Sequence, residues 1–448
     1  MDWKNKRVAV IGCARSGIAA AKKLKELGAI PFLSEFRPQD DCKDALSTLS
    51  QINYECGGHS NKLLDNELII VSPGVPLDIP ILVAAREKQI PVWSELEFGY
   101  QLTKGTSSKI IAVTGSNGKS TTVSLIYHIL KESGIKALLA GNIGLPFTSF
   151  PIEKGMYDYI VLEVSSFQLD TIQDFKPDIA VLLNITLDHL NRYHTLDAYK
   201  TSKLRIFENQ TGQDRALLNF DDPECRIITN RIEAQKYWYS IEEKVNDLVW
   251  FDGDKIYIET KKNTIEISRN ELQIRGLHNV SNAVVSSLAA LLCDVKPKHI
   301  LAALKTFTGL EHRLEWVAEI DGKIFINDSK ATNCVSVEKA LSSFDRPINL
   351  IMGGSDKHED FSSLIPLMIE HVRNLIILGE TQKQIYETFE NNVKSHKVAD
   401  LEEAVRLGND LAQSGEYVLL SPGCASYDMY NNFEERGRHF KEIVKNLQ

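Results

Sequence analysis

The 448-residue sequence is 43% hydrophobic and has a formal net charge of −9, with acidic and basic residues interspersed. A chain of this length holds roughly two or three ordinary cores, and no basic stretch indicates a nucleic acid as the main partner. The seven cysteines are scattered and include no Cys-x-x-Cys pair, which argues against a disulfide framework and a zinc cage. With no apolar run of about 18 residues, we expect a soluble, cytoplasmic protein that binds small molecules and no membrane.

Short apolar runs alternate with helix-period segments along the chain and predict an α/β fold with parallel sheets. These runs are residues 7–12, 109–115, 159–164, 179–186, 374–378 and 417–423. Polar segments at 101–109 and 306–315 separate them into groups. We therefore expect three domains, at 1–98, 99–308 and 309–448.

The first expected strand runs into the segment VIGCARSG, which gives the pattern Gly12-x-Ala14-x-x-Gly17. Glu35 follows at the end of the next expected strand. This is a degenerate dinucleotide fingerprint that lacks its second glycine. Taken alone, it leaves a nicotinamide-dependent oxidoreductase open.

The segment IIAVTGSNGKSTT, residues 110–122, is an apolar strand that enters a glycine-rich turn. Gly115 and Gly118 allow backbone amides to close around phosphate oxygens, and Lys119 supplies a positive charge to them. A hydroxyl that can ligate magnesium follows, from Ser120 or Thr121. The segment predicts a binding loop for a nucleoside triphosphate.

The match to a standard phosphate loop is incomplete, because Val113 stands where the first glycine belongs. Apolar residues recur at helical spacing after the loop and stop at Gly134, so that a helix N-terminus faces the same phosphates. The alternative is an accidental strand, turn and helix with a surface lysine. A nucleotide-switched binding protein without chemistry also fits the loop.

Polar residues follow several later strands, where parallel sheets carry their ligands. Glu163 ends one apolar strand and is a candidate magnesium ligand, or else a solvated carboxylate. Asp188 and His189 follow the next strand, and His189 can equally be structural. Asn279 and Asn282 stand at an expected helix start, where they can simply cap it. The alternating residues 255–267 predict an antiparallel hairpin added to the central domain.

The motifs resemble the Mur ligases of bacterial peptidoglycan synthesis, over the whole chain and in the same order. They are TGSNGKST, LEVSSFQL, DHLNRYHTLDAYKTSK, HNVSNA, EHRLE, NDSKATN and LLSPGCASYDMYNNFEERG. The resemblance implies an N-terminal Rossmann-like domain that binds a UDP-linked substrate and a central domain with a P-loop ATPase-like parallel sheet. It further implies a C-terminal Rossmann-like domain that binds an amino acid.

The last motif is most similar to the members that add D-glutamate to UDP-N-acetylmuramoyl-L-alanine, with ATP as the energy source. The resemblance thus implies an ATP-dependent carboxylate–amine ligase of cell-wall biogenesis that acts through an acyl phosphate, with functions in cell shape, division and cycle. Ligases of the same superfamily that add another amino acid, or glutamate to folate, remain open. We expect a monomer.

The resemblance also implies the roles of individual residues. ATP contacts fall on Gly115, Ser116, Asn117, Gly118, Lys119, Ser120, Thr121, Asn279, Asn282, Arg313 and Asp328. Contacts to the UDP substrate fall on Ser16, Glu35, Arg37, Ser72, Pro73, Gly74, Asn142, Ser165 and Gln168, and contacts to D-glutamate on Thr332, Lys357, Ser426 and Phe433. Two magnesium ions are expected, one at Ser120 and Glu163 and one at His189 and a carbamylated Lys203; Lys119, His189 and Lys203 are the implied catalytic residues.

Overall fold

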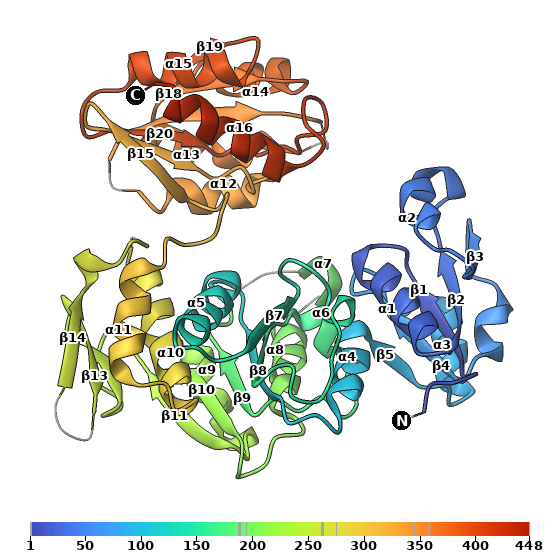
Figure 1. Ribbon diagram of the computed structural model, residues 1–448. Coiled ribbons are helices and arrows are strands. Elements are labelled where there is room, and N and C mark those ends of the chain that lie inside the picture. Colours follow the sequence, from blue (N-terminus) through green and yellow to red (C-terminus); the bar gives the residue numbers. More distant parts are fainter. Residues whose placement is uncertain are drawn as a thin grey trace. The chain divides into compact units, whose positions relative to one another are not determined.

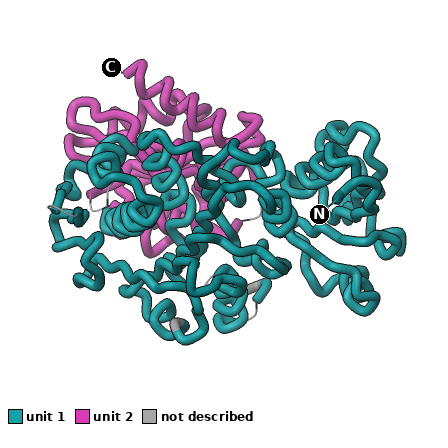
Figure 2. The backbone as a smooth tube through the Cα atoms, turned by 60° about the horizontal axis from the view of Figure 1, so that its bottom comes forward, with its two compact units in different colours: residues 1–307 teal, residues 308–448 magenta. Residues whose placement is uncertain are grey.

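The computed structural model describes residues 2–186, 190–193, 195–260, 264–274, 276–344, 346–356 and 359–447. The chain divides into two compact units, residues 1–307 and 308–448 (Figure 2). The first unit contains two parallel sheets and a small antiparallel sheet, and the second contains one mixed sheet. The predicted α/β class is confirmed, while the separation of unit 1 near residue 98 stays a prediction.

The N-terminal sheet is parallel and has the strand order β3-β2-β1-β4-β5. Its strands are β1 (Arg7–Ile11), β2 (Ile30–Glu35), β3 (Asn53–Cys56), β4 (Leu68–Val71) and β5 (Val92–Ser94). The connections hold α1 (Arg15–Glu26), η1 (Gln39–Cys42), α2 (Lys43–Ser47), η2 (Asn61–Asp65) and α3 (Pro80–Glu87). Val8 and Val10 pack on one face of β1, and Ala9 and Ile11 on the other, so this strand is apolar throughout because both faces are covered.

The central sheet is also parallel, with the order β11-β10-β9-β6-β8-β7 (Figure 1). Its strands are β6 (Lys109–Thr114), β7 (Ala137–Gly141), β8 (Tyr159–Glu163), β9 (Ile179–Leu182), β10 (Arg215–Asn219) and β11 (Gln235–Tyr239). Its helices are α4 (Glu95–Thr103), α5 (Lys119–Glu132), η3 (Phe147–Ser149), α6 (Ser166–Leu169), α7 (Leu190–Tyr193), α8 (Leu196–Leu204), η4 (Arg205–Phe207), α9 (Pro223–Ile227), η5 (Ile228–Arg231), α10 (Leu277–Leu292) and α11 (Pro297–Thr306). Among the residues described here, none of the helices is long and apolar enough to cross a membrane.

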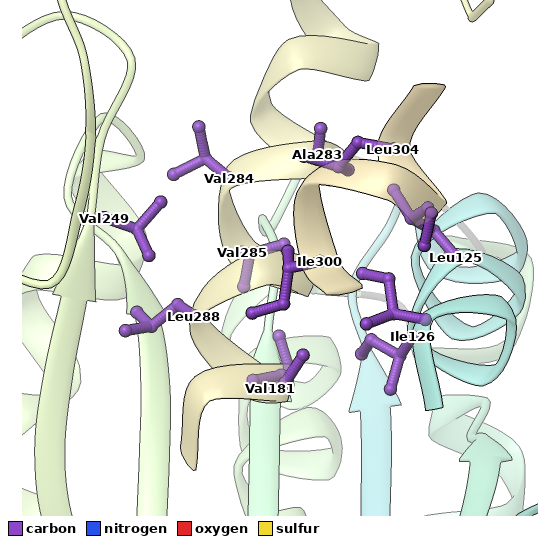
Figure 3. Packing of buried hydrophobic residues seen from close by; sticks show 14 of the residues in the cluster. Leu125, Ile126, Val181, Val249, Ala283, Val284, Val285, Leu288, Ile300 and Leu304 are labelled. Carbon is purple, nitrogen blue, oxygen red and sulfur yellow. The ribbon is translucent and has the colours of Figure 1, made fainter. Parts of the chain in front are cut away.

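One face of the central sheet is covered by α5, α10 and α11. Leu125 and Ile126 of α5, Leu288 of α10 and Ile300 of α11 belong to one buried cluster with Val181 of β9 (Figure 3). The same cluster reaches the small antiparallel sheet of β12 (Val249–Phe251), β13 (Lys255–Glu259) and β14 (Thr264–Ser268), followed by η6 (Arg269–Glu271). The predicted hairpin is confirmed, and its turn lies outside the described residues. Because α5 is fixed by this packing, the loop before it is fixed as well.

The second unit has a mixed sheet with the order β15-β16-β20-β17-β18-β19, in which only β15 is antiparallel to its neighbour among the described strands. Its strands are β15 (Glu315–Ile320), β16 (Lys323–Asn327), β17 (Ile348–Gly353), β18 (Val372–Leu378), β19 (Lys394–Lys397) and β20 (Tyr417–Leu420). Its helices are α12 (Cys334–Leu341), η7 (Phe361–Leu364), α13 (Ile365–His371), α14 (Gln382–Phe389), α15 (Leu401–Leu411) and α16 (Phe433–Lys445). The loops after β16, β17 and β20 leave the same edge of the parallel part of the sheet.

Glu97 of α4 joins the helix after the N-terminal sheet to a loop of the central sheet. Its side chain is fully buried. One carboxylate oxygen accepts hydrogen bonds from the backbone N–H groups of Gln173, Asp174 and Phe175, at 2.8, 3.1 and 2.9 Å. The other accepts one from Gln101 Nε2 at 2.6 Å. A single buried carboxylate therefore binds three successive backbone N–H groups of this loop and the side chain of Gln101.

We predict that Glu97→Ala lowers the free energy of unfolding of unit 1 by on the order of 3 kcal/mol, because buried donors lose their acceptor. Hydrogen exchange at residues 173–175 should accelerate markedly. Glu132→Ala, at an exposed position of α5, is the control and should leave exchange unchanged. Equal exchange rates at residues 173–175 in wild type and Glu97→Ala would contradict the conclusion that the Glu97 carboxylate holds this loop.

Candidate active site

The glycine-rich loop connects β6 to α5 and leaves almost no room for side chains. Gly118, with φ of +83°, precedes the helix, and a Cβ there would lie 2.7 Å from Asn282 Oδ1. Gly115 has φ of +155°, and a Cβ there would lie 2.9 Å from the Cβ of Leu183. Glycine is therefore required at both positions, and the chain passes closely between Leu183 and Asn282 before the helix begins.

The loop is held to the strand beside it by side chains. Ser116 Oγ donates to the carbonyl of Thr186 at 3.1 Å and accepts from its N–H at 3.0 Å. Asn117 N–H donates to Asn184 Oδ1 at 2.8 Å. These bonds fix the loop to the end of β9, which explains the polar residues after that strand.

Two lysines converge on the loop carbonyl of Gly115. Lys119 Nζ donates to it at 2.7 Å and also to the carbonyl of Ser116 at 2.9 Å. Lys203 Nζ of α8 donates to the same carbonyl at 2.9 Å, and its side chain is only 1% exposed. Lys203 also lies 4.4 Å from the ring centroid of Tyr199. The structure thus brings Lys203, which we assigned only through family resemblance, to the phosphate loop.

Glu163 ends β8 directly beside the strand that leads into the loop, in register with Val113. Its side chain is buried, and Oε1 accepts from Asn142 Nδ2 at 2.7 Å. No described residue is a hydrogen-bond partner of its Oε2. A buried carboxylate oxygen without a partner is costly unless a cation meets it, so this side chain fits a magnesium ligand.

The first turn of α10 lies against the start of α5. Asn282 Oδ1 accepts from Thr122 Oγ1 at 3.1 Å, and its Nδ2 donates to Asn279 Oδ1 at 3.1 Å. Asn282 therefore borders the loop and Asn279 lies beside Asn282, while the contact of both with a nucleotide stays a prediction. Ser165 and Gln168, in contrast, form a reciprocal cap at the start of α6. This cap explains their presence structurally, and their contact with substrate stays a prediction.

At the carboxyl edge of the N-terminal sheet, Glu35, Arg37 and Cys13 form one polar cluster. Glu35 Oε2 accepts from the N–H of Cys13 at 2.8 Å, and Oε1 accepts from Arg37 Nε at 3.1 Å. Burial alone would raise the pKa of Glu35, but hydrogen bonds from Arg37 and Cys13 outweigh it and lower the pKa to about 2.

Ser72 Oγ donates to the carbonyl of Gly12 at 3.2 Å in the same region. The carbonyl of Pro73, which precedes Gly74, accepts from Arg192 Nη1 at 2.8 Å.

In unit 2, buried Asp328 follows β16 and accepts from Ser421 Oγ at 2.9 Å and from the N–H of Leu314, next to Arg313, at 3.2 Å. Burial raises the pKa of Asp328 to about 7, against the opposing effect of these hydrogen bonds. Thr332 lies in the loop after this strand, and Ser426 in the loop after β20.

Arg436 of α16 is a residue that the sequence did not single out. Its guanidinium is buried and donates to Ser329 Oγ at 3.0 Å, to the carbonyl of Ser329 at 2.9 Å and to that of Cys424 at 3.1 Å. It therefore ties together the loops after β16 and β20, which carry Asp328 and Ser426. The carbonyl of Phe433 accepts from Ser329 Oγ at 2.8 Å, so the start of α16 joins the same network. Nothing in the local sequence distinguishes Arg436 from a surface arginine of a helix, because its partners lie in loops that are distant in sequence.

Two implied site residues, His189 and Lys357, lie outside the described residues, as does Asp188. Within unit 1 the structure assembles Lys119, Lys203 and Asn282 around the loop, with Glu163 ending the adjacent strand. Parallel sheet, glycine-rich loop and buried carboxylate define a nucleotide-binding α/β protein of the phosphate-loop type.

Comparison with known proteins shows to which family of phosphate-loop proteins the chain belongs. Residues 6–94 match the MurD-like N-terminal domain of Mur ligases, residues 113–290 the Mur ligase middle domain, and residues 312–424 the glutamate ligase domain. The chain belongs to the Mur ligase family, as the motifs predicted.

Full-length relatives support the same family. The UDP-N-acetylmuramoylalanine--D-glutamate ligase of Alkaliphilus metalliredigens is 40% identical to this chain, and the match covers 100% of both chains. The ligase of the same name from Caldicellulosiruptor bescii is 42% identical, and the match covers 100% of this chain and 99% of the relative. Among solved structures, MurF from Acinetobacter baumannii has a TM-score of 0.60 at 17% identity, covering 98% of this chain and 94% of its own. The UDP-N-acetylmuramate-alanine ligase MurC from Thermotoga maritima has a TM-score of 0.58 at 18% identity, covering 99% of this chain and 100% of its own. These structures confirm the fold.

We predict that the stability of unit 2 falls between about pH 4 and about pH 7 because of Asp328. The folded state holds its proton up to a pKa of about 7, whereas the unfolded carboxyl loses it near 3.9. The folded state is therefore favoured most at low pH, and this advantage is lost as pH rises through 7.

Asp328→Asn should flatten this dependence by on the order of 3 kcal/mol over that range, measured by urea unfolding at several pH values. The matched control is Asp321→Asn, at an exposed turn of the same unit. If the free energy of unfolding depends on pH in the same way in wild type and Asp328→Asn, the buried carboxyl of Asp328 is not the cause of that dependence.

Proposed function

We propose that the protein is a UDP-N-acetylmuramoylalanine--D-glutamate ligase, which joins D-glutamate to UDP-N-acetylmuramoyl-L-alanine in peptidoglycan precursor synthesis while ATP is cleaved to ADP and phosphate. The observation that carries this proposal is about 40% identity over the whole chain with ligases of that name. The converging lysines and the buried Glu163 of unit 1 support it, since both suit a triphosphate.

In the first step, the alanine carboxylate of the UDP substrate attacks the γ-phosphorus of ATP, and the bond to the β,γ-bridging oxygen breaks. The products are an acyl phosphate and ADP. The amine of D-glutamate then attacks the acyl carbon and loses a proton. The tetrahedral intermediate expels phosphate and leaves the amide.

The first step joins two anions, so catalysis depends on positive charge and fixed donors around the γ-phosphate. Lys119 and the amides at the start of α5 supply both. Ser120 and Glu163 are the proposed ligands of one magnesium ion, and His189 and Lys203 those of a second. Bound magnesium would neutralise phosphoryl and carboxylate oxygens.

The position of Lys203 supports its carbamylation. Two ammonium groups, of Lys119 and Lys203, share the carbonyl of Gly115, and like charges this close repel each other. Reaction of the deprotonated Lys203 Nζ with carbon dioxide replaces one cation by an anionic carbamate, and two protons are released in all, one from the ammonium group and one as the carbamate forms. The carbamate offers oxygen atoms to a hard cation, which an ammonium cannot.

The remaining assignments follow the family. Ser16, Glu35, Arg37, Ser72, Pro73, Gly74, Asn142, Ser165 and Gln168 are the proposed contacts of the UDP substrate, and Thr332, Lys357, Ser426 and Phe433 those of D-glutamate. Asn279, Asn282, Arg313 and Asp328 are the proposed adenosine contacts. The three-domain division, the monomeric state and the cytoplasmic location stay predictions.

We predict that Lys119→Ala lowers kcat/KM about 100- to 1,000-fold, because charge stabilisation in the transition state is lost. Phosphate release should require ATP, the UDP-muramoyl-alanine substrate and D-glutamate together. Lys131→Ala, at an exposed position on the same helix, should retain activity. Release that depends on L-alanine or a diamino acid in place of D-glutamate would favour another ligase, and release indifferent to amino acid would favour a nucleotide switch.

We predict that removal of dissolved carbon dioxide lowers the activity of the wild type and that bicarbonate restores it, because the carbamate of Lys203 forms reversibly. Lys203→Ala should be strongly impaired and insensitive to bicarbonate. Lys200→Ala, on the same helix, should keep the wild-type response. A wild type with full activity at every carbon dioxide level would refute carbamylation while leaving the ligase assignment intact.

A further inference from the structure

Two cysteine thiols and a carboxylate meet at the carboxyl edge of the N-terminal sheet. The Sγ atoms of Cys13 and Cys42 and a carboxylate oxygen of Glu35 all lie within 4.8 Å of one another, and all three residues are buried. The cysteines are free thiols. Sulfur and carboxylate donors gathered from separate segments are the set that binds Zn²⁺ in proteins.

Strand topology builds this set. Cys13 lies just after β1 and Glu35 ends β2, and these neighbouring parallel strands finish at the same edge. Cys42 ends η1, which brings its thiol to that edge. Cys56 ends β3 in direct register with Glu35 and is partly exposed. Three ligands are therefore held by the fold, and a fourth donor lies on the adjacent strand.

We propose that Cys13, Cys42 and Glu35 form a binding site for a thiophilic divalent cation such as Zn²⁺, with Cys56 as the fourth ligand. A tetrahedral zinc site places its donors about 3.8 Å apart, given zinc–sulfur distances of about 2.3 Å. The donor atoms of Cys13, Cys42 and Glu35 lie within 4.8 Å of one another, so side-chain adjustments of about 1 Å bring these three to zinc-binding distances.

The charges around the site are compatible with a bound cation. Arg37 Nη2 lies 3.4 Å from Cys13 Sγ, and Arg37 Nε donates to Glu35. Three thiolates and a carboxylate carry two more charges than a divalent cation neutralises, and the guanidinium of Arg37 offsets one of them. A thiol loses its proton when it coordinates a cation, so protons and the cation compete for the same sulfur atoms. Affinity should therefore fall as pH falls.

The site is separate from the proposed magnesium ligands, which are oxygen donors of the central sheet. It also does not depend on the ligase assignment. Glu35 and Arg37 are proposed contacts of the UDP substrate, so a bound cation would occupy the carboxylate that this substrate is expected to meet.

The test is a titration of the full-length, phosphine-reduced protein with Co²⁺, without ATP or substrate. Coordination by sulfur gives an intense charge-transfer absorption in the near ultraviolet, which oxygen sites do not give. We expect this absorption in the wild type, its reversal by Zn²⁺, and an affinity about 100-fold or more lower in Cys13→Ser and Cys42→Ser. Cys293→Ser is the matched control, because Cys293 is also a buried free cysteine.

A second measurement requires no substitution. Zn²⁺ uptake by the wild type should release about two protons per ion or more, because each coordinating thiol loses its proton. Absence of the sulfur absorption, its persistence at full strength in both serine variants, or Zn²⁺ uptake without proton release would overturn the proposal.

Discussion

The close approach of the phosphate loop to its neighbours is the constraint on which the rest of unit 1 depends. Gly115 and Gly118 leave no space for a Cβ against Leu183 and Asn282. The loop backbone is therefore fixed between β9 and α10, and α5 must begin where the loop ends. Packing of α5, α10 and α11 on one face of the sheet (Figure 3) then keeps that geometry, since interiors are dense and resist small shifts.

The same confined loop explains why charge gathers there. Lys119 and Lys203 reach one carbonyl from two helices, and Glu163 ends an adjacent strand with a buried oxygen that lacks a partner among the described residues. Such an arrangement is unfavourable in an isolated protein, because two cations repel and a buried carboxylate oxygen stays unsatisfied. Anionic phosphates and hard cations are the ligands that remove both penalties together. The site is thus built for the charges of its substrates.

Local sequence predicted the strand, loop and helix of this site and the position of Glu163, because these depend on neighbours in the chain. It did not predict by itself that Lys203 reaches Gly115, since that contact depends on where α8 packs. Arg436 was missed for the same reason: its role is visible only when the loops after β16 and β20 lie side by side. The limit of prediction from local sequence is clearest for the cluster of Cys13, Cys42 and Glu35. Their separation in sequence matches no metal-binding spacing, and the fold alone brings them together.

Gly12 and Gly17 explain the degenerate dinucleotide fingerprint at the N-terminus without a nicotinamide cofactor. Gly12 has φ of +96°, and a Cβ on Gly17 would lie 1.9 Å from the carbonyl oxygen of Gly12. Both glycines are therefore needed for the tight turn and for packing α1 on the sheet. The second glycine of the fingerprint, which lets a pyrophosphate approach the backbone, is replaced here by Ala14. Glu35, the counterpart of the ribose-binding acid of a nicotinamide site, accepts hydrogen bonds from Cys13 and Arg37, so its place after β2 has a structural explanation of its own. The fingerprint here is a consequence of the Rossmann-like turn and gives no support to an oxidoreductase.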